Sequence, residues 1–257
     1  MRLRAESTGP ESVEATVLAV PLYREDEPFA SDLANLDAAA GGVIRRAIDW
    51  GAFNILEDYS TLIEAGDLPV DHILLVNGVR RGRGAWRARR TASVATRRLR
   101  GTGATRMALW LRDGEGPDEF AAAAMGAIEG GYRPMDIYGR QRDTEAMKRN
   151  VEEVVLLGAE QAALDHAATV ADGVAWCRDL ANRSANDLYP EQMAEVAREL
   201  EADGCTVQIL HVPEMRALGM NALLGVGQGS EHPPVLIAIK LPGWETADLA
   251  RRLAIVG

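Results

Sequence analysis

The chain has 257 residues, of which 47% are hydrophobic and 26% are charged, and its formal net charge is −10. This composition is that of a soluble globular protein with enough apolar residues for a core, and the acidic balance argues against general nucleic-acid binding. No apolar run is long enough to span a bilayer, and the first residues lack the apolar stretch of a secretory signal. We therefore expect no membrane association and a cytoplasmic location.

Strand and helix patterns alternate over the first two thirds of the chain. Short apolar and β-branched runs predict strands at 13–20, 72–79, 104–111 and 151–158. Helices are expected near 41–53, within the arginine-rich stretch 80–106, from Pro117 to the paired glycines Gly130 and Gly131, and as one long helix over 159–183. The segment 24–37 has the character of an acidic connection. This alternation predicts an α/β fold with a mixed, mostly parallel sheet flanked by helices.

The remaining third has a different pattern of elements. We expect a helix at 190–204, a strand at 205–212, one or two helical turns at 213–219, and strands at 221–227 and 234–241. The sequence therefore predicts three parts: an N-terminal α/β domain over 1–155, a connecting helix over 156–185, and the first strands and helices of a second α/β domain over 186–257.

Glycines alternate with other residues in "GVGQGS", at Gly225, Gly227 and Gly229. A phosphate-binding loop needs a strand before it and a helix behind it, so that backbone N–H groups converge on the anion. Here Pro233, Pro234 and an apolar run follow, which predict a strand. We therefore expect a hairpin-like connection and no nucleotide site.

Other catalytic patterns are also missing from the sequence. The four histidines are isolated from one another, no G-x-S-x-G segment occurs, and the acidic residues show no ligand spacing. Cys177 and Cys205 have no C-x-x-C partner, and we expect both to be buried free thiols. The residues predict no catalytic or metal-binding side chain within 1–257.

Ten arginines and no acidic residue occur between Arg80 and Arg106. On a helix, Ala88, Ala92, Ala95 and Leu99 share one narrow apolar band, whereas the arginines lie outside it, which predicts an exposed face that is purely cationic. Such a face is either solvated or paired with acids elsewhere in the chain, or it contacts a polyanion such as nucleic acid. The candidate contact residues for the second alternative are Arg80, Arg81, Arg83, Arg87, Arg90, Arg97 and Arg98.

The later part of the chain resembles the leucyl aminopeptidases, also called cytosol aminopeptidases. The resemblance rests on "CRDLANRSANDLYPEQMAEVAREL" and "VQILHVPEMRALGMNALLGVGQGSEHPPVLIAIKLPG". The family pattern maps onto Arg178-Asp179-Leu180 with Asn182, onto Asn186 with Pro190, and onto Leu218-Gly219-Met220 with the segment Gly225 to Ser230. "ILLVNGV" and "AIEGGYRPMDIYG" upstream resemble the N-terminal domain of the same family.

The resemblance implies a metalloaminopeptidase, a hydrolase that releases N-terminal amino acids from peptides with two divalent metal ions, manganese or zinc. In the family the glycine segment is structural, and the first metal ligands follow a strand that "LAIVG" resembles. We therefore expect a fragment that ends before the metal site, binds no metal and is inactive alone. Family members form hexamers, and some bind DNA. The alternatives are a nucleic-acid-binding module that uses the arginine-rich face 80–106, and a structural partner that assembles with complete subunits.

Overall fold

The computed structural model describes residues 1–23, 29, 31–54, 60–78, 84–112, 116–134, 149–248, 250 and 252–257. The chain divides into two compact units, Met1–Ala181 and Asn182–Gly257, and each is described by itself. Three of the candidate nucleic-acid contact residues, Arg80, Arg81 and Arg83, lie outside the described residues. No helix in the described part of the chain is long and apolar enough to cross a membrane.

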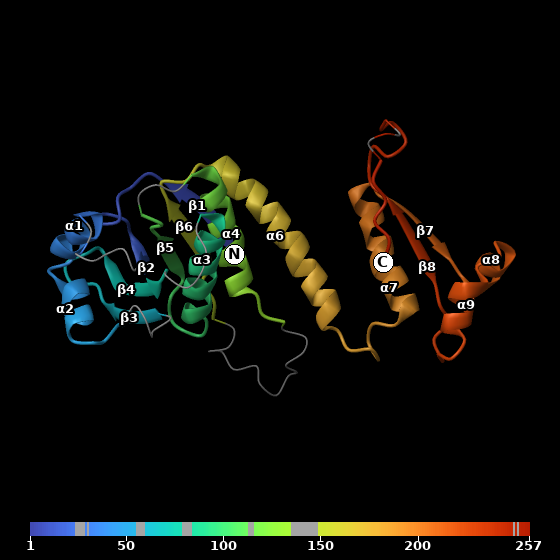
Figure 1. Ribbon diagram of the computed structural model, residues 1–257, viewed down its shortest axis with the longest axis horizontal. Helices are drawn as coiled ribbons and strands as arrows, with labels where there is room; N and C mark the ends of the chain where they lie inside the picture. Colours follow the sequence, from blue (N-terminus) through green and yellow to red (C-terminus); the bar gives the residue numbers. More distant parts are fainter. Residues whose placement is uncertain are drawn as a thin grey trace. The chain divides into compact units, whose positions relative to one another are not determined.

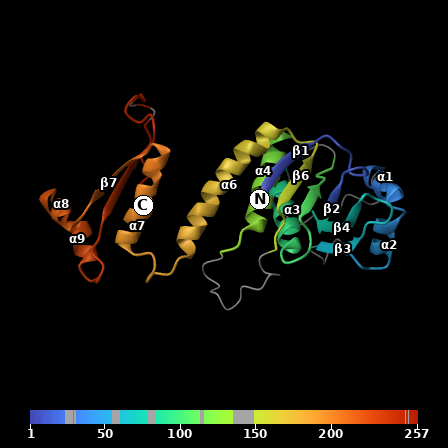
Figure 2. The same cartoon turned by 180° about the vertical axis from the view of Figure 1, so that it is seen from behind.

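The first unit is built on a sheet whose six described strands have the order β1-β6-β5-β2-β4-β3; their arrangement can be followed in Figure 1 and, from behind, in Figure 2. All neighbouring strands are parallel except β3 and β4, which confirms the mostly parallel sheet. The strands are β1 (Arg2–Glu6), β2 (Ala15–Leu22), β3 (Ser60–Glu64), β4 (Val70–Asn77), β5 (Arg106–Leu109) and β6 (Glu153–Leu157).

Helices cover both faces of this sheet, so the core has two halves. On β2, Val17 and Ala19 face the half that contains α3 (Ala85–Leu99) and α4 (Pro117–Gly131). Leu18 and Val20 face the other half, with α1 (Ser31–Ala39) and α2 (Val43–Asp49). A central parallel strand covered on both faces must be apolar at every position, which explains the unbroken run "VLAV" from Val17 to Val20.

Helices α3 and α4 pack against each other at very short distance. A Cβ atom at Gly126 would lie 2.0 Å from the carbonyl oxygen of Arg89, and one at Gly130 would lie 2.4 Å from that of Ser93. These two glycines are four residues apart and therefore share one face of α4. Their missing side chains are what allows the two backbones to touch.

Three described elements of the first unit were not predicted: α1, β1 and β3. The edge strands β1 and β3 show weak apolar alternation, because edge strands bury less than central ones. Helix α1 lies within the segment expected to be an acidic connection. Its Leu33 and Leu36 are buried, and Asp37 accepts hydrogen bonds from the backbone N–H groups of Ile44 (2.9 Å) and Arg45 (3.1 Å).

The second unit is small and contains a two-stranded antiparallel sheet. Its elements are α7 (Pro190–Glu199), a 3-10 turn (Leu200–Asp203), β7 (Thr206–Leu210), α8 (Val212–Ala217), α9 (Asn221–Gly227) and β8 (Leu236–Lys240). Strand β7 pairs with β8 from Thr206 opposite Lys240 to Leu210 opposite Leu236. Helix α7 begins at Pro190, as the sequence predicts.

The strand expected at 221–227 is wrong, because this segment forms helix α9. Its leucines and alanine favour a helix, and its one β-branched residue, Val226, is almost fully exposed, so it gains nothing from a sheet. Gly219, with φ +74°, provides the left-handed turn that separates α8 from α9.

Candidate functional site

The Arg178-Asp179 pair, which belongs to the family-like sequence, binds a tyrosine of the first unit. Both residues lie near the end of the long helix α6 (Gln161–Asn182). The hydroxyl of Tyr132 donates a hydrogen bond to Asp179 Oδ1 at 2.5 Å, and the Arg178 guanidinium stands 3.9 Å from the centre of the same ring. Tyr132 follows α4 directly. The two motif residues therefore connect the end of α6 to the end of α4.

The second unit starts with a short ion-paired turn. The side chain of Arg183 donates to Asp187 Oδ2 at 2.6 Å and to the Asp187 carbonyl oxygen at 3.2 Å. This hydrogen bond lowers the pKa of the Asp187 carboxyl group. The pair holds the turn ahead of Pro190, the first residue of α7.

A second cluster in this unit joins Tyr189 and Glu191, at the start of α7, to His232. The rings of Tyr189 and His232 stack with their centres 4.0 Å apart and an interplanar angle of 19°. His232 Nδ1 lies 3.9 Å from Glu191 Oε2. Sequence reasoning treated His232 as isolated, because its partners are about forty positions upstream and no local spacing signals them.

The glycine segment does not form a phosphate cradle. Gly225 and Gly227 lie inside α9, and Gly229 lies in the turn that follows. A cradle would need the glycines ahead of a helix N-terminus, where N–H groups are free. The expected hairpin-like connection is wrong, because the segment is helical up to Gly227. That it binds no nucleotide stays a prediction.

The buried face of the arginine-rich helix α3 is as predicted, and one arginine outside that face pairs with an acid of another helix. Ala88, Ala92, Ala95 and Leu99 are buried in the core, as expected. However, Arg89 forms a two-pronged ion pair with Glu129 of α4, including a 3.0 Å bond from Nε, and this hydrogen bond raises the pKa of the Arg89 guanidinium. For Arg89 this is the alternative in which the arginines are paired with acids elsewhere in the chain.

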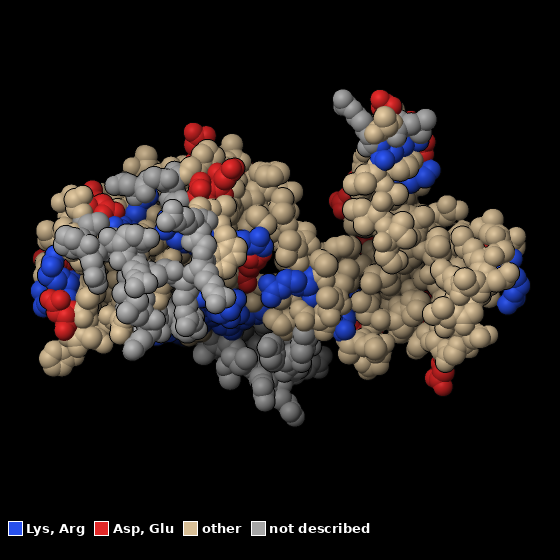
Figure 3. All heavy atoms as spheres, viewed as in Figure 1, with Lys and Arg blue, Asp and Glu red and all other residues tan. Residues whose placement is uncertain are grey.

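The described candidate contact residues of α3 differ in exposure. Arg97 and Arg98 are exposed, whereas Arg87 and Arg90 are half-buried. The Arg87 guanidinium lies 4.2 Å from the Tyr23 ring centre, and that of Arg90 lies 5.7 Å from the Trp86 ring centre. On the face drawn in Figure 3, described basic and acidic side chains are interspersed. Nucleic-acid contact through these arginines stays a prediction that no geometric feature favours.

The two cysteines are not buried as expected. Cys177 is exposed on α6 and Cys205 is half-exposed, and both are free thiols. Cys177 lies in the last part of α6, beyond the buried residues Leu164, Ala167 and Ala171. Its burial was expected only because its neighbours in the sequence are apolar.

The described residues do not fit a metal site. Within the ranges that the structure describes, no group of three or more His, Cys, Asp or Glu side chains is placed to hold a metal ion. Two-metal hydrolysis needs several such ligands together with an activated water. No hydrolytic step can therefore be assigned to these side chains, and the absence of ligands from 1–257 stays a prediction.

Comparison with known proteins gives cytosol aminopeptidases among the sequence matches and a shared fold among the structural matches. The pattern of the cytosol aminopeptidase family, catalytic domain, matches residues 175–257. A probable cytosol aminopeptidase of Caulobacter vibrioides is 33% identical over 254 residues, which are 95% of this chain and 50% of the relative. One of Mycobacterium marinum is 35% identical over 241 residues, 90% of this chain and 44% of the relative. The chain thus spans about half the length of the curated relatives it matches.

Solved structures share the fold at lower sequence identity. A mutant of tomato leucine aminopeptidase matches with a TM-score of 0.80 and 21% identity, covering 93% of this chain and 50% of that one. The bottromycin maturation enzyme BotP in complex with Mn matches with a TM-score of 0.67 and 24% identity, covering 88% and 45%. The sequence matches support the assignment of this chain to the cytosol aminopeptidase family, and the structural matches show that it shares the fold of these proteins.

Proposed function

We propose that these residues form the N-terminal portion of a two-metal aminopeptidase, which releases N-terminal amino acids from peptides. The observation that carries the proposal is the match of residues 175–257 to the catalytic domain of the cytosol aminopeptidases. The relatives' names state this activity, and the chain aligns with one of them over 95% of its own length.

The metal requirement is the second part of the proposal. The complete enzyme would use two divalent ions, manganese or zinc, which act as Lewis acids and lower the pKa of a bound water. A structural relative holds manganese, which supports this choice. Because the described residues form no ligand cluster, we assign the ions to no side chain here and propose that the 257-residue polypeptide alone does not hydrolyse peptides.

The oligomeric state and the cellular location of the complete enzyme are the third part of the proposal. We propose that the complete enzyme is a cytoplasmic homo-oligomer, a hexamer, and that peptides are its substrates. The relatives' names, which contain the word cytosol, support the location.

The proposal is tested with leucine p-nitroanilide as the substrate. The product expressed from the native gene, of measured intact mass, should release p-nitroaniline in the presence of Mn²⁺ and lose this activity with a chelator. The 257-residue polypeptide, assayed identically, should release none. An inactive native product in Mn²⁺ and in Zn²⁺ would contradict the aminopeptidase proposal, and an active 257-residue polypeptide would contradict the proposed inactivity.

A further inference from the structure

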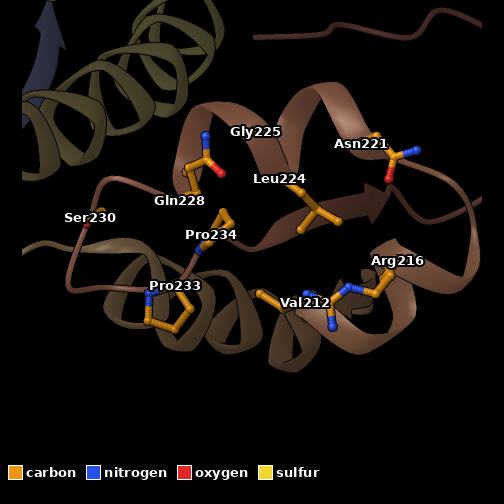
Figure 4. A pocket seen from close by; sticks show the side chains of 10 residues that line it. Val212, Arg216, Asn221, Leu224, Gly225, Gln228, Ser230, Pro233 and Pro234 are labelled. Carbon is orange, nitrogen blue, oxygen red and sulfur yellow. The ribbon is translucent and has the colours of Figure 1, made fainter.

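A pocket of about 440 Å³ lies within the second unit, between α8, α9 and the turn behind α9. Figure 4 shows it from close by, with Leu224 directed from α9 toward α8 and Arg216 directed inward from α8. Its size is in the range of sites for small organic molecules. It is formed by the glycine segment, for which the proposed aminopeptidase chemistry provides no role.

The lining has one charge and several neutral polar groups. Arg216 is its one charged residue; it is joined by Asn221, Gln228 and Ser230, while Leu224 and Pro234 are among its apolar residues. The Arg216 guanidinium forms no ion pair or hydrogen bond with any residue in the described part of the chain. Arg216 is exposed, and its guanidinium is a planar five-donor fork that suits a carboxylate, whereas Gln228 and Ser230 lie at the other end of the lining in Figure 4.

The walls of the pocket are held by specific contacts. Gly227 packs directly on Pro234, since a Cβ atom at Gly227 would lie 2.6 Å from the Pro234 ring. The Met220 N–H donates to the Met215 carbonyl oxygen at 3.0 Å, and Met215 is completely buried, which fixes α8 against α9. The stacking of His232 on Tyr189 anchors the turn that contains Ser230. A site whose walls are fixed before binding loses little entropy on binding.

We propose that this pocket binds a small molecule with one carboxylate and one small apolar group, such as the carboxyl end of a short peptide or an N-blocked amino acid. Arg216 pairs with the carboxylate, and Leu224 and Pro234 contact the apolar group. A fork of parallel N–H···O bonds favours carboxylate over a spherical anion, and the apolar wall requires the ligand's hydrocarbon part. For a ligand of this size we expect a Kd on the order of 1 mM.

Gly225 offers a test that leaves the fold intact. It lines the pocket, and a Cβ atom there would meet nothing within 4 Å. Gly225→Val therefore adds an apolar side chain at the pocket lining with no clash at its Cβ atom. Gly229→Ala is the matched control, because Gly229 also has open space around its Cβ position and does not line the pocket.

The experiment is a titration of the ¹⁵N-labelled 257-residue chain, followed by amide chemical shifts. The probes are N-acetyl-leucine, N-acetyl-leucinamide, which lacks the carboxylate, and inorganic phosphate. N-acetyl-leucine should shift the amides of α8 and α9, and the amide analogue should bind at least about tenfold more weakly. Arg216→Gln and Gly225→Val should each weaken binding by about tenfold or more, whereas Gly229→Ala should leave it unchanged.

Three results would overturn the proposal. The first is the absence of shifts in α8 and α9 at N-acetyl-leucine concentrations up to about twenty times the expected Kd. The second is equal binding of N-acetyl-leucinamide, which would show that Arg216 does not recognise the carboxylate. The third is phosphate binding as strong as that of N-acetyl-leucine, which would identify an unspecific anion site. Binding is the only readout, so the result does not depend on aminopeptidase activity.

Discussion

Arg112 and Asp32 form a two-pronged ion pair between the segment behind β5 and the first turn of α1. The Nε and Nη2 atoms of Arg112 each donate to a carboxylate oxygen of Asp32 at 2.7 Å. The Arg112 side chain is 5% exposed and that of Asp32 is 17% exposed. Arg112 is the one non-glycine residue in the described ranges with a positive φ, 73°. Its Nη1 also donates to the Pro21 carbonyl oxygen at 3.4 Å, so one side chain ties α1 to the ends of β2 and β5.

Asp32→Asn should destabilise the first unit at neutral pH by about 2–3 kcal/mol, because it removes the carboxylate charge that accepts two hydrogen bonds from a buried guanidinium. The hydrogen bond from Arg112 lowers the pKa of Asp32. Because the pKa of Asp32 is lower in the folded state, its ion pair contributes fully to the free energy of unfolding at pH values above the unfolded pKa of about 3.9. This contribution is lost as the pH falls through the folded-state pKa.

Hydrogen exchange of β2 and β5 amides, measured at pH 7 and at stepwise lower pH, checks this prediction. The difference between wild type and Asp32→Asn should shrink as the pH falls below about 4. Asp187→Asn is the control, because the Asp187 side chain is 58% exposed and its pair with Arg183 should contribute little. A difference that stays constant down to low pH would show that Asp32 acts through packing and not through its charge.

Gly126→Ala and Gly130→Ala should each destabilise the first unit by about 1–3 kcal/mol, because a methyl group would force α3 and α4 apart. Gly173→Ala in α6 is the matched control. It also lies inside a helix, its Cβ position is open, and alanine there should be neutral or stabilising by up to about 1 kcal/mol. Urea unfolding followed by far-ultraviolet circular dichroism compares the three. Equal effects of all three substitutions would show that helix propensity, and not close packing of α3 on α4, determines the change in the free energy of unfolding.

The sequence predicted the covered parts of the molecule well and the exposed parts poorly. Strand β2 and the buried face of α3 were found because a core imposes a strict pattern on apolar residues. The 221–227 segment was misassigned because a short, exposed, leucine-containing run carries no such pattern. The long-range pairs Arg112–Asp32 and Tyr189–His232 have no local signature, since the fold brings together residues that are 80 and 43 positions apart.

The candidate site was also predicted only in part. The family-like segment was recognised from residue types, and its match to the catalytic domain supports that reading. The pocket at Arg216 was missed, because the residues that line it come from two helices and a turn, and the sequence reading had made one of those helices a strand. The acidic partner of Arg89 was not identified, because Glu129 belongs to a different helix and the sequence alone does not place α4 against α3.

Cys177 should react quickly with a thiol reagent in the native protein, because its side chain is exposed on α6. Cys205 is less exposed and should react more slowly. Ellman's reagent, with Cys177→Ser and Cys205→Ser to assign the two phases, measures both rates. Fast labelling of Cys177 that is lost at high protein concentration would indicate that α6 is covered by a second copy. Slow labelling at every concentration would contradict the exposed position of Cys177.

Tyr132→Phe should loosen the end of α6 while keeping the first unit folded. The substitution removes the 2.5 Å hydrogen bond to Asp179 and retains the ring on which Arg178 stacks. Loss of one hydrogen bond to a charged acceptor at an exposed site should cost about 1 kcal/mol, which corresponds to roughly fivefold faster local opening. Hydrogen exchange of residues 172–182 measures that opening, and amides of 161–171, which lie beside the buried residues of α6, are the internal reference. Tyr132→Leu, which removes both contacts, should have a larger effect. Equal exchange in wild type and both variants would show that packing elsewhere, and not the contact of Tyr132 with the Arg178-Asp179 pair, holds the end of α6.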